Sequence, residues 1–217
     1  MPAMTALHLV IGNRNYSSWS MRPWLAMRMA DVPFTEQIIW LDTPTARDQK
    51  LRFAPSGRVP ILIEDGHPTW DSLAICERVA ELFPDRGMWP ADPRDRATAR
   101  SLVAEMHSGF QALRTEMPLN CRRRKPLGRP GSAALTADIA RITSIWNDAR
   151  GPFLFGRFGI ADAFFAPVAG RFLGYQVELT GAAAAYHSRM IALPAFVEWF
   201  EAGAAETQRI PATDAIP

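Results

Sequence analysis

Two short segments of the sequence place polar groups where they could hold a small peptide. Val59-Pro60 precedes the apolar run 61–63, and a proline donates nothing to a strand ladder. We therefore predict a cis bond between Val59 and Pro60, a geometry nearly confined to X-Pro bonds. Such a bend leaves the N–H and C=O of Val59 free to pair with an extended peptide. Asp71-Ser72 opens a helical pattern eleven residues after Pro60, and helix N-termini bind carboxylates. Together these features predict a site for a small acidic peptide.

A serine-rich loop could supply the chemistry at this site. Ser17, Ser18 and Ser20 precede Pro23, and a proline is best tolerated in the first helical turn, so we place the N-cap near Ser20. Ser17 then lies just outside the helix, with its hydroxyl free to donate a hydrogen bond to a thiolate. That bond and the helix dipole would lower a thiol pKa from its intrinsic value of ~8.5. The alternative is that all three serines are loop and capping residues.

The bulk composition excludes several classes of function. The chain has 217 residues, 48% of them hydrophobic and 21% charged, with a net charge of +2, so no global field favours nucleic acid. No apolar run approaches the roughly 18 residues of a membrane span, and the N-terminus lacks the form of a signal peptide. Four histidines and two cysteines show no metal-ligand spacing, so we expect no metal. Cys76 lies on an apolar helical stripe, and the cysteine usage favours a cytoplasmic location.

Apolar periodicity divides the chain into two domains. Residues 1–83 read as a compact α/β domain of order β-α-β-α-β-β-α, residues 84–94 as a proline-rich linker, and residues 95–217 as an all-α domain. The tail after Arg209 is expected to be loosely ordered. The expected strands cover residues 7–12, 34–40, 61–63 and 69–70, and the expected helices cover 21–29, part of 43–53, and 73–83.

Four motifs, in order and at the right spacing, resemble the cytosolic glutathione S-transferases. They are Ser17-Ser18-Trp19-Ser20-Met21-Arg22, Pro55-Ser56-Gly57-Arg58-Val59-Pro60-Ile61-Leu62, Asp71-Ser72-Leu73-Ala74-Ile75 and Phe155-Gly156-Arg157-Phe158-Gly159-Ile160-Ala161-Asp162-Ala163. The resemblance spans about residues 7–205 and is greatest to serine-type, zeta- or theta-like bacterial members. It implies the GST fold, in which a thioredoxin-like N-terminal domain binds glutathione and the all-α domain that follows carries the pocket for an electrophile.

The resemblance also implies how glutathione is held. Val59, beside the cis-proline Pro60, matches the residue whose backbone pairs with the cysteinyl part of glutathione. Asp71 and Ser72 match the pair that binds the γ-glutamyl end, with Ser72 on its carboxylate and Asp71 on its ammonium group. Arg58 precedes the bend and is expected near the glycyl carboxylate.

The serine loop carries the family's catalytic position. Ser17 falls where serine-type members place the hydroxyl that stabilises the glutathione thiolate, and Ser18 is the neighbour that could replace it. Trp19 stands where zeta-class members usually have cysteine, which argues against their isomerase activity. No cysteine occupies the Ser17 position either, which argues against disulfide exchange of the omega type.

The second domain offers further candidates for the pocket that receives the electrophile. His107 and Arg114 lie along or just after its first long helix, and Arg171 lies inside an apolar helix, where a charge needs a partner or a cavity. A lone helical histidine is also compatible with simple packing. The basic run 122–125 fits either a solvated loop or a rim that attracts anionic substrates. Gly159 and Asp162 fit a helix cap, which makes Asp162 structural.

These observations together favour a glutathione transferase that activates the thiolate for attack on an electrophilic carbon. The family implies a homodimer with no nucleic-acid or membrane partner. Two alternatives stay open. One is a glutathione-dependent isomerase of the maleylacetoacetate type or a dehalogenase, and the other is a non-catalytic binding protein of the same fold.

Overall fold

The first half of the chain forms a four-stranded sheet flanked by three helices. A computed structural model describes residues 6–217, so the N-terminal segment judged above for a signal peptide lies outside the described residues. The strand order is β2-β1-β3-β4, with β1 parallel to β2 and antiparallel to β3. The elements are β1 (Leu7–Gly12), α1 (Ser18–Met29), β2 (Thr35–Ile39), α2 (Ala46–Leu51), β3 (Ile61–Glu64), β4 (His67–Thr69) and α3 (Ser72–Leu82). The predicted order is therefore confirmed.

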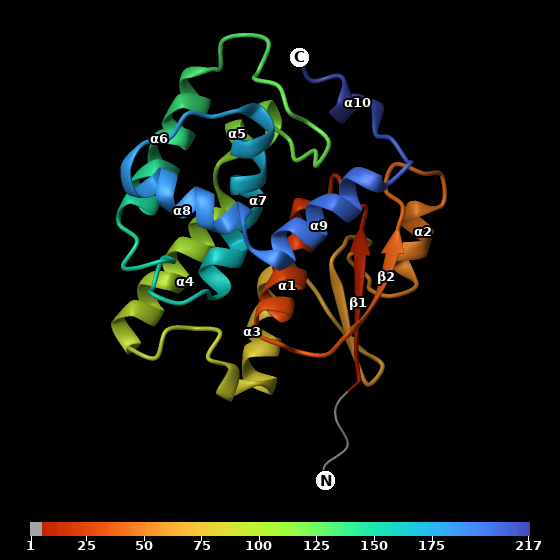
Figure 1. Cartoon of the computed structure of the whole chain (residues 1–217). Coiled ribbons are helices and arrows are strands. Elements are labelled where there is room, and N and C mark those ends of the chain that lie inside the picture. Colours follow the sequence, from red (N-terminus) through yellow and green to blue (C-terminus); the bar gives the residue numbers. More distant parts are fainter. Residues whose placement is uncertain (1–5) are drawn as a thin grey trace.

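Alternation along β1 explains how the sheet is covered on both faces. Leu9 and Ile11 are fully buried in the main core with α1 and α3, whereas Val10 joins a smaller cluster with Ile39 and Ile61. Figure 1 shows α1 and α3 on the side of the sheet that faces the helical domain and α2 on the far side. The end of β1 and the start of α1 therefore lie at the junction of the two halves.

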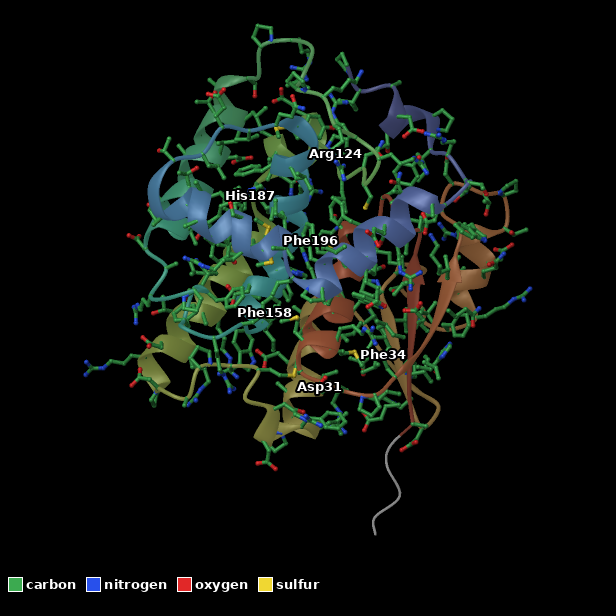
Figure 2. All side chains as sticks on the ribbon, in the orientation of Figure 1. Asp31, Phe34, Arg124, Phe158, His187 and Phe196 are labelled. Atoms are coloured by element: carbon green, nitrogen blue, oxygen red, sulfur yellow. The ribbon has the colours of Figure 1, made fainter. Side chains whose placement is uncertain are left out.

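The second half is helical in all of its named elements. They are the short 3-10 turn η1 (Pro84–Arg86), α4 (Pro93–Ser108), α5 (Gln111–Glu116), α6 (Ala133–Asn147), α7 (Ile160–Tyr175), α8 (Gly181–Ile191), α9 (Pro194–Ala205) and α10 (Pro211–Asp214). Nearly every residue of α7 is buried, because α1, α4 and α8 all pack against it. On α9, Phe196, labelled in Figure 2, stacks on Phe200 with ring centroids 4.4 Å apart. The GST fold predicted from the sequence is confirmed.

Three local expectations need correction or refinement. The first long helix expected of the second domain is two helices, because α4 ends at Ser108 and Phe110, with a φ of 59°, caps a separate helix α5. Asp92 caps α4, and this helix therefore begins at Pro93, inside the expected linker. The tail after Arg209 is not loosely ordered, because it forms α10 and is tied to the rest of the protein by hydrogen bonds. None of the helices described between residues 6 and 217 has the length and apolar character needed to span a bilayer.

Asp162 has the structural role that the sequence indicates. Its carboxylate accepts hydrogen bonds from the Gly159 N–H at 2.9 Å, the Leu154 N–H at 3.0 Å and the Tyr186 hydroxyl at 2.9 Å. Burial nevertheless raises the pKa of Asp162 to about 6, against the opposing effect of these donors. The side chain thus fixes the start of α7 and the loop before it.

Candidate functional site

A cleft of about 730 Å³ lies where the sheet domain meets α4. Most of its wall comes from the loops that follow β1, β2 and α2 and from the segment before α3, and His107 of α4 is its one lining residue from the helical domain within the described part of the chain. The lining residues are Tyr16, Ser17, Trp19, Leu41, Lys50, Ser56, Arg58, Val59, Pro60, Trp70, Asp71 and His107. Five of the seven residues predicted to act at the glutathione site lie here: Ser17, Arg58, Val59, Pro60 and Asp71.

Ser17 is the N-cap of α1, so the predicted cap at Ser20 was wrong. The Ser17 hydroxyl oxygen accepts from the Ser20 N–H at 3.4 Å and donates to the Ser20 hydroxyl at 2.8 Å. The error came from Pro23, which α1 accommodates in its second turn rather than its first. Ser20 instead holds the end of β1, because its hydroxyl accepts from the Gly12 N–H at 3.1 Å. Ser17 therefore both caps the helix and faces the cleft.

The structure separates the two serines that the sequence left equivalent. Ser17 lines the cleft at the N-terminus of α1. Ser18 is equally buried but does not line the cleft among the described residues, and its hydroxyl oxygen accepts from a guanidinium nitrogen of Arg171 at 3.3 Å. A thiolate in the cleft would therefore meet the Ser17 hydroxyl, together with the positive end of the α1 dipole.

The bend and the start of α3 form the opposite part of the wall. The Val59–Pro60 bond is cis, as predicted, and the Trp70–Asp71 bond is cis as well. Asp71 caps α3, with one carboxylate oxygen accepting from the Leu73 N–H at 2.9 Å. Its other oxygen lies 3.0 Å from Nε2 of His107.

Ser72 and Arg58 differ in how much of each reaches the cleft. Ser72 is fully buried as the first residue of α3, and its hydroxyl oxygen accepts from Arg22 at 3.4 Å. Arg58 is exposed at the cleft edge, where its backbone N–H donates to the Ser56 hydroxyl oxygen at 3.4 Å. An anionic ligand in the cleft could therefore reach the guanidinium of Arg58 directly, whereas Ser72 stands one layer deeper.

Behind the cleft lies a layer of three arginines. Arg22, on α1, is 1% exposed, and its guanidinium stands 4.1 Å from the ring centroid of Trp19 and 4.8 Å from that of Phe164. Burial, together with the positive charges of Arg114 and Arg171, lowers the pKa of Arg22 well below its ordinary value. Its Nε is buried without a hydrogen-bond partner among residues 6–217. Sequence reasoning missed this residue, although a charge in an apolar helix was the signal that singled out Arg171.

Arg114, which is half-buried, and Arg171, which is buried, belong to the same layer, and neither lines the cleft among the described residues. Arg171 donates to the Met117 carbonyl at 2.8 Å and to Ser18, and burial lowers the pKa of Arg171 to about 9. Arg114 donates to the Gly109 carbonyl at 3.0 Å and stands 5.0 Å from the Trp19 ring centroid. Within residues 6–217, no carboxylate hydrogen-bonds to either of these guanidiniums or to that of Arg22. The direct substrate contact expected of Arg114 and Arg171 therefore stays a prediction that this geometry does not favour.

His107 is the one predicted helical residue that reaches the cleft. Its ring packs edge-on against Trp19, with centroids 5.2 Å apart, and its Nδ1 is buried without a partner among the described residues. Burial is the main cause that lowers the pKa of His107, and the charge of Asp71 opposes it. Because a carboxylate only accepts hydrogen bonds, the Nε2–H of His107 donates to Asp71.

The basic run 122–125 is neither wholly a solvated loop nor a rim of the cleft. Arg122 is partly buried and Arg123 is buried, and both donate to backbone carbonyls of the C-terminal tail. Arg124 and Lys125 are exposed. Arg124, labelled in Figure 2, lies on the loop after α5, away from the cleft.

A second hollow, of about 600 Å³, lies beside the linker and does not carry the features of a reactive site. Trp89, Phe155 and Phe158 line it, and the carboxylate of Asp162 at its base is already occupied by three hydrogen-bond donors. The described residues also contain no group of three or more His, Cys, Asp or Glu side chains able to share a metal ion. Of these two hollows, the cleft at Ser17 is therefore the stronger candidate for a reactive site.

The chain folds into a thioredoxin-like domain followed by a helical domain, and a helix-capping serine and a cis-proline face one cleft. These features define the class of two-domain glutathione-dependent proteins. Family models match both halves: "Glutathione S-transferase, N-terminal domain" over residues 16–82 and "Glutathione S-transferase, C-terminal domain" over residues 95–202. The chain belongs to the glutathione S-transferase family.

Similar sequences include proteins of several named activities. The chain is 29% identical to a probable maleylacetoacetate isomerase of Caenorhabditis elegans over 61% of this chain and 61% of that protein. It is 26% identical to the maleylacetoacetate isomerase of Rattus norvegicus over 84% of this chain and 87% of that protein. A 38% identical match to dichloromethane dehalogenase of Methylorubrum extorquens covers 27% of this chain and 21% of that protein. The matched segments thus span less than two thirds of the first and third of these relatives.

Solved structures share the fold over nearly the whole chain. A glutathione transferase homologue from Burkholderia GL BGR1, solved with bound glutathione, has a TM-score of 0.70 at 22% identity and covers 91% of this chain and 98% of its own. Glutathione transferase Omega 2S from Trametes versicolor has a TM-score of 0.73 at 20% identity and covers 97% of this chain and all of its own.

Proposed function

We propose that this protein binds glutathione in the cleft at Ser17 and activates its thiol for attack on an electrophilic carbon. The observation that carries the proposal is that Ser17, at the N-terminus of α1, lines the same cleft as the cis bend at Val59–Pro60 and the cap residue Asp71. One cleft thus offers a thiolate stabiliser, a backbone edge and a carboxylate that can face an ammonium group.

The reaction that this geometry supports is activation of a nucleophile followed by conjugation. The Ser17 hydroxyl turns from Ser20 toward the sulfur, and its hydrogen bond and the α1 dipole favour the thiolate. The three arginines behind the cleft add positive charge without occupying it. The thiolate then attacks the electrophile, and the cleft contributes by holding the two reactants together.

Isomerisation of a maleyl-type diacid is the second candidate. Two observations favour it: maleylacetoacetate isomerases recur among the similar sequences, and the layer of arginines gives the cleft a positive background suited to an anionic substrate. Trp19 at the position of the zeta-class cysteine opposes it. Turnover of a maleyl diacid without net consumption of glutathione would identify the isomerase, whereas loss of free thiol with a chloroarene would identify the transferase.

The test of the proposal is calorimetric titration of glutathione into the purified protein, repeated on Asp71→Asn, whose side chain lines the cleft and can still cap α3. We expect saturable binding that weakens about tenfold in the variant, because the ligand's ammonium group loses a charge-assisted hydrogen bond. Ser101→Ala, which removes an exposed hydroxyl of α4 outside the cleft lining, is the matched control. If the wild type binds no glutathione, the proposed enzyme activity is rejected, and the alternative of a non-catalytic binding protein with the same fold takes its place.

Two further properties stay predictions. The family implies a homodimer, in which the first domain of one subunit contacts the second domain of the other, and light scattering of the purified protein would measure its mass. The cytoplasmic location inferred from cysteine usage would be tested by cell fractionation.

A further inference from the structure

The segment after α9, residues 206–217, passes over the loops of the sheet domain before it ends against the loop after α5, where Arg123 donates to the carbonyls of Ile216 at 2.8 Å and Pro217 at 2.7 Å. Figure 1 shows this segment, which we call the C-terminal strap, passing beside the loop that follows β2 and then through α10 to the C-terminus. Its first contact is Glu206, whose two carboxylate oxygens accept from the backbone N–H groups of Arg14 at 2.7 Å and Asn15 at 3.1 Å. The strap thus begins by fixing the loop that leads from β1 to Ser17.

The second contact fixes the loop after β2, which also lines the cleft. Gln208 donates from its side-chain amide to the Leu41 carbonyl at 2.5 Å, and its amide oxygen accepts from the side chain of Asn13. Asn13 in turn accepts from the Leu41 N–H at 2.7 Å. Leu41 lines the cleft, so the strap ties the two loops at the ends of β1 and β2 to each other.

The third contact is on Tyr16, the cleft residue next to Ser17. Its hydroxyl donates to the carboxylate of Asp214 at 3.0 Å and accepts from the Ile210 N–H at 3.1 Å. Arg122 donates to the same hydroxyl. The hydroxyl hydrogen of Tyr16 is therefore directed at Asp214 and not at the sulfur position, so Tyr16 does not serve as the thiolate's donor, although its ring lines the cleft.

The strap is held by polar contacts and not by apolar burial. No residue of α10 is buried, and Ile210 and Ile216 are only partly buried. A segment with so little buried apolar surface opens at a lower free energy than the core. Loss of one of its hydrogen bonds should therefore loosen the loop before Ser17 while leaving the two domains folded.

We propose that the C-terminal strap is a positioning device that holds Tyr16 and Leu41 as the walls of the glutathione cleft, with the Tyr16–Asp214 hydrogen bond as its principal anchor. This rests on the proposed function, since the cleft must bind glutathione for the strap to matter to it. When the anchor is broken, only a fraction of the molecules keeps the loop before Ser17 in the conformation that binds glutathione. The apparent affinity for glutathione is then reduced in proportion to that fraction.

A double-mutant cycle on Tyr16→Phe and Asp214→Ala tests this proposal. Each variant should raise the KM for glutathione about threefold to tenfold, the range that follows from loss of one net hydrogen bond, with a smaller change in kcat. The double variant should lose less affinity than the sum of the two single losses, because both substitutions remove the Tyr16–Asp214 bond. Full overlap is not expected, since Tyr16→Phe also removes the bonds from Ile210 and Arg122, and Asp214→Ala also removes the bond from Asn120. Asp214→Asn keeps an acceptor oxygen and should recover most of the affinity.

Amide hydrogen exchange of residues 14–18 provides a readout that does not depend on activity. It should become faster in Tyr16→Phe and Asp214→Ala while exchange in α7 stays unchanged. Arg209→Ala, which removes only the exposed ion pair to Asp214 at 3.5 Å, is the matched control and should behave as wild type.

The outcomes separate the strap from the proposed function. Additive effects of the two substitutions, or unaltered KM and exchange in both, overturn the positioning role. If the wild type binds no glutathione, the proposed function fails, and the exchange of residues 14–18 alone decides whether the strap orders that loop.

Discussion

The surface of the cleft and the layer behind it hold their charged and polar groups in opposite ways. On the surface, Ser17 and Asp71 sit at helix N-termini, where each caps its own helix within three residues and still faces the cleft. In the layer behind, Arg22 and Arg171 are buried, come from helices far apart in the sequence, and have no carboxylate hydrogen bond within residues 6–217. The surface groups owe their position to local backbone geometry, whereas the buried groups depend on the packing of α1 against α7.

That difference indicates which part of the site is the more fragile. A helix cap is worth about 1 kcal/mol and fails locally. A buried guanidinium requires that the surrounding helices stay in register, because its partners are carbonyls and a hydroxyl held by other elements. Damage to α7 should therefore cost far more stability than damage to the cleft surface, and the substitutions below test that order.

Asp162→Ala should give the largest effect. It leaves the N–H groups of Leu154 and Gly159 and the hydroxyl of Tyr186 without their acceptor, which should lower the free energy of unfolding by about 3–5 kcal/mol. Urea denaturation followed by circular dichroism measures this. Asp92→Ala, which removes an exposed cap of α4, should lower the free energy of unfolding by about 1 kcal/mol. Equal losses of unfolding free energy in the two variants would contradict the expected difference between buried and exposed polar groups.

The same side chain makes a pH-dependent prediction. Because burial raises the pKa of Asp162 from 3.8 to about 6, the folded state binds more protons than the unfolded state between these values, so this group's contribution to stability decreases as the pH rises through that window. Relative to Asp162→Asn, which stays neutral, the wild type should lose about 2 kcal/mol between pH 4 and 6. A constant difference over that range would contradict the assignment.

Ser17→Ala should have the largest effect on chemistry and a modest one on stability. Loss of a hydrogen bond to a charged sulfur should lower kcat/KM about 10- to 100-fold and raise the pKa of the bound thiol, read from thiolate absorbance. Because Ser17 also caps α1, unfolding should become about 1 kcal/mol easier. Ser18→Ala, directed toward Arg171, is the paired variant and should change kcat/KM by less than about threefold. The reverse ranking would move the thiolate partner to Ser18.

His107→Gln should have the smallest effect and a pH signature. Burial lowers the pKa of His107 from its ordinary value of 6.5, so the ring gains its proton only as the pH falls below that value. The imidazolium then pairs with Asp71 at 3.0 Å and competes with the glutathione ammonium. The wild-type KM for glutathione should rise about two- to fivefold between pH 7 and 5, and His107→Gln should flatten that rise. Identical pH profiles would assign His107 to packing alone.

Local rules were sufficient for much of the fold and the cleft surface. The cis bond at Val59–Pro60, the cap at Asp71 and the capping box of Asp162 follow from a proline before a strand and from polar residues before apolar helices. The cap of α1 was misplaced because the preference of proline for the first helical turn is only statistical. In this protein Pro23 lies in the second turn of α1.

Tertiary structure alone decided which distant groups meet. The sequence identifies Arg171 as a buried charge but does not show that it faces Ser18, because 153 residues separate the two and their contact depends on how α7 packs on α1. The strap contact of Asp214 with Tyr16 spans 198 residues and rests on polar hydrogen bonds without any apolar periodicity. Hydrophobic spacing records which face of an element is buried, whereas the partner across the interface is selected only when the whole chain folds.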